Sequence, residues 1–151
     1  MDAERARAFL LTLPHVVETM QWGNNLVFWI GDKAIGGKMF TLLSLDGRFG
    51  SAVAFAAGAE RAAELVEQEG IFPAPYLARA GWVAAKRWDV LRSREWQGHF
   101  THAHGVVFAK LPARTRTSLA LPPKALKQLI AARRQLLTQQ IATRPVKQKS
   151  H

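Results

Sequence analysis

The sequence predicts an α+β fold in which helices pack on one face of an antiparallel β-sheet. Three observations lead to this fold class. Short apolar runs are separated by the dipeptides Gly31-Asp32, Gly36-Gly37 and Asp46-Gly47, which are typical of turns between antiparallel strands. Amphipathic segments with helical spacing precede, interrupt and follow these runs. A chain of 151 residues with 48% hydrophobic side chains can also bury one substantial core.

The chain is predicted to open with a helix. Asp2 can cap its first turn, apolar residues follow at three- and four-residue steps, and Pro14 ends it after about Leu13. Trp22-Gly23-Asn24 is typical of a turn. The extended runs that follow lie between the turn dipeptides, over residues 26–30, 33–35, 38–45 and 49–55.

A second helix is predicted over about 59–69, where Gly70 supplies the left-handed residue that commonly ends a helix. A further strand is predicted over about 81–88. Alternate residues point to opposite faces of a strand, and in these strands both faces are apolar. The second face of the sheet therefore needs a cover, which a helix of the same chain, a twin subunit or a ligand could supply.

Two more helices complete the predicted chain. Ser93 caps the third helix, which ends before Pro112, and Pro123 opens a fourth that continues to about Ile141. The third helix has one apolar stripe, formed by Trp96, Phe100, Ala103 and Val107. The stripe of the fourth is formed by Leu126, Leu129, Ile130, Leu136, Leu137 and Ile141. The sequence thus predicts an amphipathic helix near the C-terminus.

The distribution of charge along the chain is uneven. All eleven acidic residues lie at or before Glu95, and residues 96–151 carry ten Lys and Arg with no Asp or Glu. The net charge of +10 therefore belongs to the last third of the sequence. A strongly basic region attracts polyanions, of which nucleic acid is the commonest. The alternative is a solvated face that only aids solubility.

Six cations are candidates for contacts with the phosphates of a nucleic acid. Some lie on the fourth helix, some in a short loop before it, and one at the end of the third helix: Lys110, Arg114, Arg116, Lys124, Lys127 and Arg134. Phosphate contacts position a protein on DNA without reading its sequence. Arg133 falls within the apolar stripe, and we expect it to extend past the stripe or to pair with a carboxylate of the second helix.

An aromatic group on the sheet is a second candidate site. Trp29, Trp82 and Trp88, together with Lys86, could form a platform on which bases stack. The alternative is that these rings belong to the core or to a dimer contact, because Trp is mostly buried.

Several classes of function are not expected. The chain has no Cys, which rules out disulfides and thiolate chemistry, and no catalytic triad, dyad or phosphate loop occurs. His99, His102 and His104 do not share one helix face, so we expect no metal site and no cofactor. No apolar run is long enough to cross a membrane, and no signal-type segment opens the chain. We therefore expect a cytoplasmic protein that is not an enzyme.

Several local strings resemble the MmcQ/YjbR family in their order and spacing. They are Leu13-Pro14-His15-Val16, Trp22-Gly23, Gly36-Gly37-Lys38-Met39-Phe40, Pro73-Ala74-Pro75-Tyr76-Leu77, Gly81-Trp82-Val83 and Ala109-Lys110-Leu111-Pro112. The resemblance covers about residues 1–112 and implies a frataxin-like two-layer sandwich, similar also to a double-wing DNA-binding domain. We therefore expect a family-like domain over 1–112. The residues that follow predict a basic helical extension over 113–142, which departs from the usual family core, and a flexible tail over 143–151.

Charge and resemblance together lead to one functional expectation. The chain is expected to be a small non-enzymatic DNA-binding protein that contacts mainly phosphates through its basic C-terminal third. The alternative is a protein-interaction or structural module that forms a homodimer through an apolar sheet face and has no nucleic-acid role.

Overall fold

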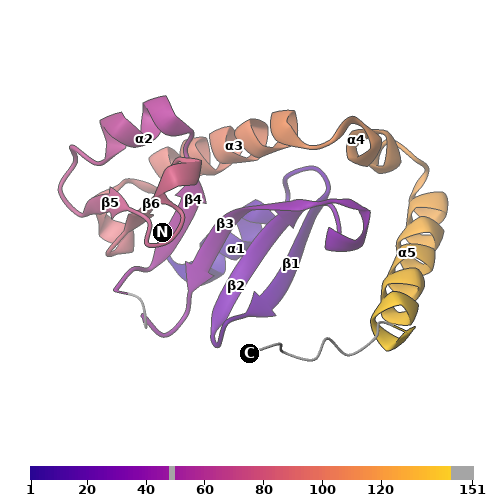
Figure 1. The fold of residues 1–151 in the computed structure, drawn as a ribbon. Coiled ribbons are helices and arrows are strands. Elements are labelled where there is room, and N and C mark those ends of the chain that lie inside the picture. The colour runs from indigo at the N-terminus through magenta and orange to yellow at the C-terminus, as the bar shows by residue number, and fades with distance from the viewer. Residues whose placement is uncertain (48–49, 144–151) are drawn as a thin grey trace.

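The computed structural model describes residues 1–47 and 50–143 (Figure 1). In these ranges, six strands form one antiparallel sheet in the order β1-β2-β3-β4-β6-β5. Their bounds are β1 (Val16–Gln21), β2 (Asn25–Ile30), β3 (Lys38–Ser44), β4 (Val53–Ala56), β5 (Ile71–Pro73) and β6 (Trp82–Ala85). Apart from its first residue, the predicted flexible tail over 143–151 lies outside the described residues.

The helices surround one side and one end of this sheet. The α-helices are α1 (Ala3–Leu10), α2 (Ala59–Leu65), α3 (Ser93–Lys110), α4 (Ala113–Leu119) and α5 (Pro123–Thr143). Three short 3-10 helices connect other elements: η1 (Lys33–Ile35), η2 (Ala78–Ala80) and η3 (Trp88–Val90). The predicted α+β class with an antiparallel sheet is confirmed.

The core lies between α1, α3 and one face of the sheet. Phe55 on β4 contacts the rings of Trp96 and Phe100 on α3, with centroid distances of 6.2 Å in both cases. The apolar stripe predicted for this helix is confirmed, since all four of its residues are buried. On the same side of the sheet, Arg7 of α1 donates to Glu18 of β1 at 2.8 Å. Figure 1 shows α1 behind the sheet and α3 above it, which matches the prediction that helices pack on one face.

Some local predictions are wrong. Residues 33–35 were expected to be extended, but Asp32 caps a 3-10 turn there: its Oδ1 accepts a hydrogen bond from Ala34 N at 2.8 Å. The segment that carries Arg114 and Arg116 was expected to be a loop and is the helix α4. β1 and β5 were not predicted. The turn predicted at 22–24 connects β1 to β2, and the two strands pair along the whole length of β1. α1 and α2 end earlier than expected, before turns that follow each helix.

Candidate nucleic-acid interface

The connection between β2 and β3, residues 31–37, is the surface on which α4 rests. Thr115 of α4 is fully buried, and its Oγ1 donates to the carbonyl oxygen of Ile35 at 2.8 Å. Gly36 permits this approach, because a Cβ at that position would lie 2.5 Å from Thr115 Oγ1. Gly36 also has a φ of 88°, in the left-handed region that favours glycine. The turn and the helix therefore fit together through one glycine and one buried hydroxyl.

A second contact holds the other end of α4. Leu119 is buried, and its Cδ2 would lie 3.2 Å from a Cβ placed on Gly31. The turn itself is tight, since a Cβ on Gly37 would lie 1.9 Å from the Gly31 carbonyl oxygen. The predicted domain boundary after residue 112 remains a prediction, but α4 contributes two buried side chains beyond it.

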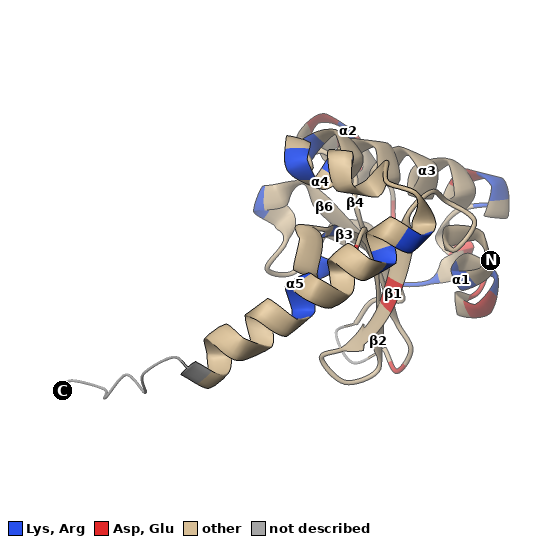
Figure 2. Cartoon of the chain, turned by 90° about the vertical axis from the view of Figure 1, so that its right-hand side faces the viewer, with Lys and Arg blue, Asp and Glu red and all other residues tan. Residues whose placement is uncertain are grey.

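Helix α5 rests on the same turn with only part of its length. Leu126, Leu129 and Ile130 pack against the core, and α5 contacts η1. Farther along the predicted stripe, Leu137 is 47% exposed and Ile141 is 74% exposed. Figure 2 shows the C-terminal half of α5 extending away from the rest of the fold. The stripe predicted from periodicity is thus partly buried in its first half and exposed in its second.

Five of the six predicted cations are exposed and have no ion pair among the described residues. They are Lys110 at the end of α3, Arg114 and Arg116 on α4, and Lys124 and Lys127 on α5. These side chains come from three consecutive helices, two of which share the support of residues 31–37. In Figure 2, α5 carries Lys and Arg and no acidic residue.

Arg134 differs from the other five. Its Nη2 pairs with Oδ2 of Asp32, the residue that caps η1. The Asp32 carboxylate is largely buried, whereas the Arg134 side chain is mostly exposed. The pair joins α5 to the turn across 102 residues of sequence. The charge of Arg134 is therefore partly neutralised by Asp32.

Sequence reasoning did not include Arg133 among the candidate cations. The expected pairing with a carboxylate of the second helix is not found among the described residues, where Arg133 has no ion pair. Instead it borders a small hollow of about 80 Å³ that residues 34–36, α4 and α5 line, with Arg114 also in the lining. The signal that could have found it is its position one residue before Arg134 in a segment without acids.

The aromatic set predicted on the sheet is dispersed. Trp82 is buried, and the Nε1 of Trp29 donates to Thr19 Oγ1 at 2.8 Å. The ring of Trp88 lies edge-on to Trp96, with a centroid distance of 5.1 Å. Lys86 is exposed at the end of β6. The three rings make no ring contact with one another in the described part of the chain.

The three histidines of α3 lie in separate surroundings. His99 stacks on Phe55, and burial is the main cause that lowers its pKa below the usual value. The Nε2 of His102 lies 3.3 Å from the carbonyl oxygen of Ala57, and that of His104 lies 2.8 Å from the carbonyl oxygen of Pro14. Within residues 1–47 and 50–143, no group of three His, Cys, Asp or Glu side chains is arranged to hold a metal ion. The same part of the chain contains no helix with the length and apolar character needed to cross a membrane.

Comparisons with known proteins point to one family. The model of the YjbR family matches residues 11–136. The crystal structure of the Deinococcus radiodurans protein DR2400, which contains the domain DUF419, has a TM-score of 0.68 and 22% identity. That similarity covers 80% of this chain and 89% of that chain. No curated protein matches. The family match continues through α4 and into α5, whereas the predicted division into a domain over 1–112 and a basic extension stays a prediction.

Proposed function

The chain belongs to the YjbR family, and from this premise we propose that it is a small non-enzymatic DNA-binding protein of the cytoplasm. The observation that carries the proposal is the set of five exposed cations on α3, α4 and α5 that make no ion pair within the described part of the chain. We propose that they contact backbone phosphates. Because such contacts carry no sequence information, binding is expected to be largely independent of sequence.

The position of these cations supports a role beyond solubility. Arg114 and Arg116 lie on a helix that is fixed by the buried side chains of Thr115 and Leu119. Cations on a fixed support lose less freedom when they meet a phosphate than cations on a mobile segment. The sequence after Glu95 contains no acid, and the only acid that pairs with a cation of α4 or α5 among the described residues is Asp32, so most of the positive charge of these helices is not neutralised by an ion pair.

The test is a fluorescence-anisotropy titration of a mixed-sequence duplex at three salt concentrations. Each neutralised phosphate contributes about 0.9 to the slope of log K against log salt, so five contacts predict a slope of roughly −4 to −5. A variant with Arg114, Arg116, Lys124 and Lys127 changed to Gln should lose most of that slope.

A matched control removes the same number of cations from another part of the surface. Arg79→Gln with Arg94→Gln removes two exposed cations from other parts of the fold and should leave binding nearly unchanged, whereas Lys124→Gln with Lys127→Gln should reduce the slope by about 2. Equal losses in the two double variants would contradict a localised interface. Removing residues after Pro112 is a poor control, because it also deletes the buried side chains of α4.

The second candidate function is an interaction module that forms a homodimer. It is favoured by partly exposed apolar side chains of β2 and β3, such as Trp29 and Leu42, and by the exposed apolar side chains on the second half of α5. Trp82 is buried and so is not available to such a contact, but Trp29 is half-exposed. Sedimentation velocity over a wide concentration range decides between the candidates: a dimer unaffected by Lys124→Gln and Lys127→Gln favours the module.

A further inference from the structure

Two arginines from consecutive helices, Arg114 of α4 and Arg133 of α5, line the same small hollow. Residues 34–36 of the turn before β3 form another part of its lining, together with Ser118 and Leu129. The hollow has a volume of about 80 Å³. Ordinary small-molecule sites begin at roughly 300 Å³, so this one suits a compact group and not an extended ligand.

The two guanidinium groups have no acidic partner at the hollow. Among the described residues, neither Arg114 nor Arg133 forms an ion pair, and no carboxylate is part of the lining. The carboxylate of Asp32 is engaged through both oxygens, one with Ala34 N and the other with Arg134. Two like charges that border one hollow repel each other, so an anion between them would stabilise the arrangement.

The walls of the hollow are anchored to the rest of the fold. Thr115, adjacent in sequence to the first arginine, is buried and donates to the carbonyl oxygen of Ile35. Leu129 packs against the core one turn before the second arginine, and the neighbouring Arg134 pairs with Asp32. The two arginines therefore extend from backbone segments that are already held in place, which lowers the ordering cost of binding an anion.

The donors at the hollow match a phosphate group with three free oxygens. A guanidinium presents its N–H groups in a planar fork that meets phosphate oxygens in pairs. The hydroxyl of Ser118 and the amides of Ile35 and Gly36 donate within the protein, so the guanidinium groups supply the contacts. A phosphate monoester carries close to two negative charges, which two arginines balance. A phosphodiester of a nucleic-acid backbone carries only one.

We propose that Arg114 and Arg133 bind one phosphate monoester group in this hollow. The group can belong to the 5′-phosphate end of a DNA strand or to a free phosphorylated molecule, and the recognised chemistry is the same. The site shares Arg114 with the proposed DNA interface. It does not depend on DNA binding, because a small phosphate ester can occupy it alone.

The test compares methyl phosphate with dimethyl phosphate in titrations followed by ¹H–¹⁵N NMR, at low salt and about pH 8. The two esters differ by one methyl group, and only the monoester is a dianion. We expect methyl phosphate to bind at least about tenfold more tightly, the effect of one further hydrogen bond between charged groups. The amide signals of residues 34–36 and 118 should shift most. Equal affinities, no saturable binding of methyl phosphate, or shifts confined to other parts of the protein would each overturn the proposal.

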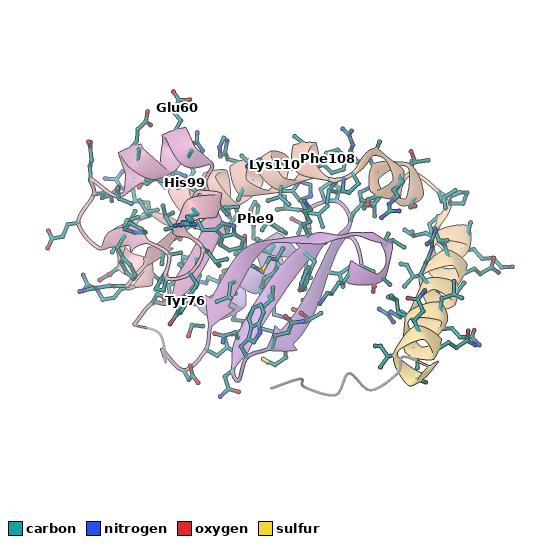
Figure 3. The ribbon with its side chains drawn as sticks, viewed as in Figure 1. Phe9, Glu60, Tyr76, His99, Phe108 and Lys110 are labelled. Carbon is teal, nitrogen blue, oxygen red and sulfur yellow. The ribbon has the colours of Figure 1, made fainter. Side chains whose placement is uncertain are left out.

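Single variants separate this hollow from the basic surface as a whole. Arg114→Gln and Arg133→Gln should each weaken the binding of methyl phosphate about tenfold or more. The controls are Lys110→Gln, at the end of α3 (Figure 3), and Arg116→Gln on α4, which remove exposed cations that do not line the hollow and should leave the affinity nearly unchanged. Because all four side chains are exposed, each variant should keep the wild-type Tm. Equal losses of affinity in the four variants would mean that general positive charge attracts the ester, and the proposal would be wrong.

A fluorescence-anisotropy titration with two duplexes identifies the source of the phosphate group. Tighter binding of a duplex with 5′-phosphate ends than of the same duplex with 5′-hydroxyl ends, in the wild type but not in Arg133→Gln, would assign the site to a DNA end. Equal binding of the two duplexes, together with tight binding of methyl phosphate, would assign it to a free phosphorylated molecule. If neither duplex binds, the DNA-binding function fails, and the titration with the two methyl esters alone decides on this site.

Discussion

Helices α4 and α5 are both basic and rest on the same turn, but they are attached very differently. α4 has seven residues and two buried side chains, Thr115 and Leu119. α5 has 21 residues, of which only the first part packs on the core. The comparison teaches that burial, not charge, decides where each cation is held. Arg114 and Arg116 are fixed with respect to the sheet, whereas the far end of α5 extends from the fold.

The largest difference between the two helices should appear when a leucine is shortened. Leu119→Ala removes a buried side chain and should lower the free energy of unfolding by about 2–5 kcal/mol. Leu137→Ala removes a half-exposed one and should change it by less than about 0.5 kcal/mol. Urea unfolding measures both. Similar losses in the two variants would mean that α5 is held along its whole length.

The hydroxyl of Thr115 should have the next largest effect. Thr115→Val keeps the shape of the side chain but leaves the carbonyl oxygen of Ile35 without its donor, at an expected cost of about 1–3 kcal/mol. Thr115→Ser restores the hydroxyl and should recover much of the loss. Thermal unfolding of both variants is the measurement, and a valine variant as stable as the wild type would contradict the anchoring role of this bond.

The ion pair that holds α5 should matter less. Because the Arg134 side chain is mostly exposed, Arg134→Gln should lower stability by about 0.5–1 kcal/mol, and the difference should shrink at high salt. Asp32→Ala should cost more than Arg134→Gln, since Asp32 also caps η1. Urea unfolding at low and high salt measures these differences. A larger loss for Arg134→Gln would indicate that the pair is the main attachment of α5.

The dependence of stability on pH should be the smallest of these effects. It should come from His99 of α3 and not from α4 or α5. Burial lowers the pKa of His99 in the folded protein, so the unfolded chain binds more protons below about pH 6.5. Stability from this group is present above the unfolded pKa and is lost as pH falls through the folded pKa. His99→Gln should flatten the dependence of Tm on pH between 7 and 5. If the slope of Tm against pH is unchanged in the variant, other titratable groups cause the pH dependence.

The parts of the fold that local spacing determines could be predicted from the sequence. The stripe of α3 and the start of α5 at Pro123 follow from helical periodicity and a first-turn proline. β1 was not predicted because Glu18, Thr19 and Gln21 interrupt its apolar residues, and its pairing with β2 stabilises it instead. α4 is short, and no side chain caps it, so it carries no local start signal.

The candidate sites likewise contain features that the sequence could predict and features that it could not. The exposure of the five cations could be expected from their lack of acidic neighbours. The partner of Arg134 could not, because Asp32 is distant in sequence. The left-handed backbone angles of Trp22 and Tyr76 could not be predicted either, because no pattern of residue types indicates them.

The turn over residues 31–37 has a consequence for the order in which the protein folds. It belongs to a meander of β1, β2 and β3, whose contacts are local and can form early, whereas its partner Thr115 is 80 residues farther along the chain. During synthesis α4 can therefore pack on the turn only after most of the chain has been made. Under mild denaturation the weakly packed second half of α5 should open before this junction, because Thr115 and Leu119 are buried in the contact between α4 and the turn.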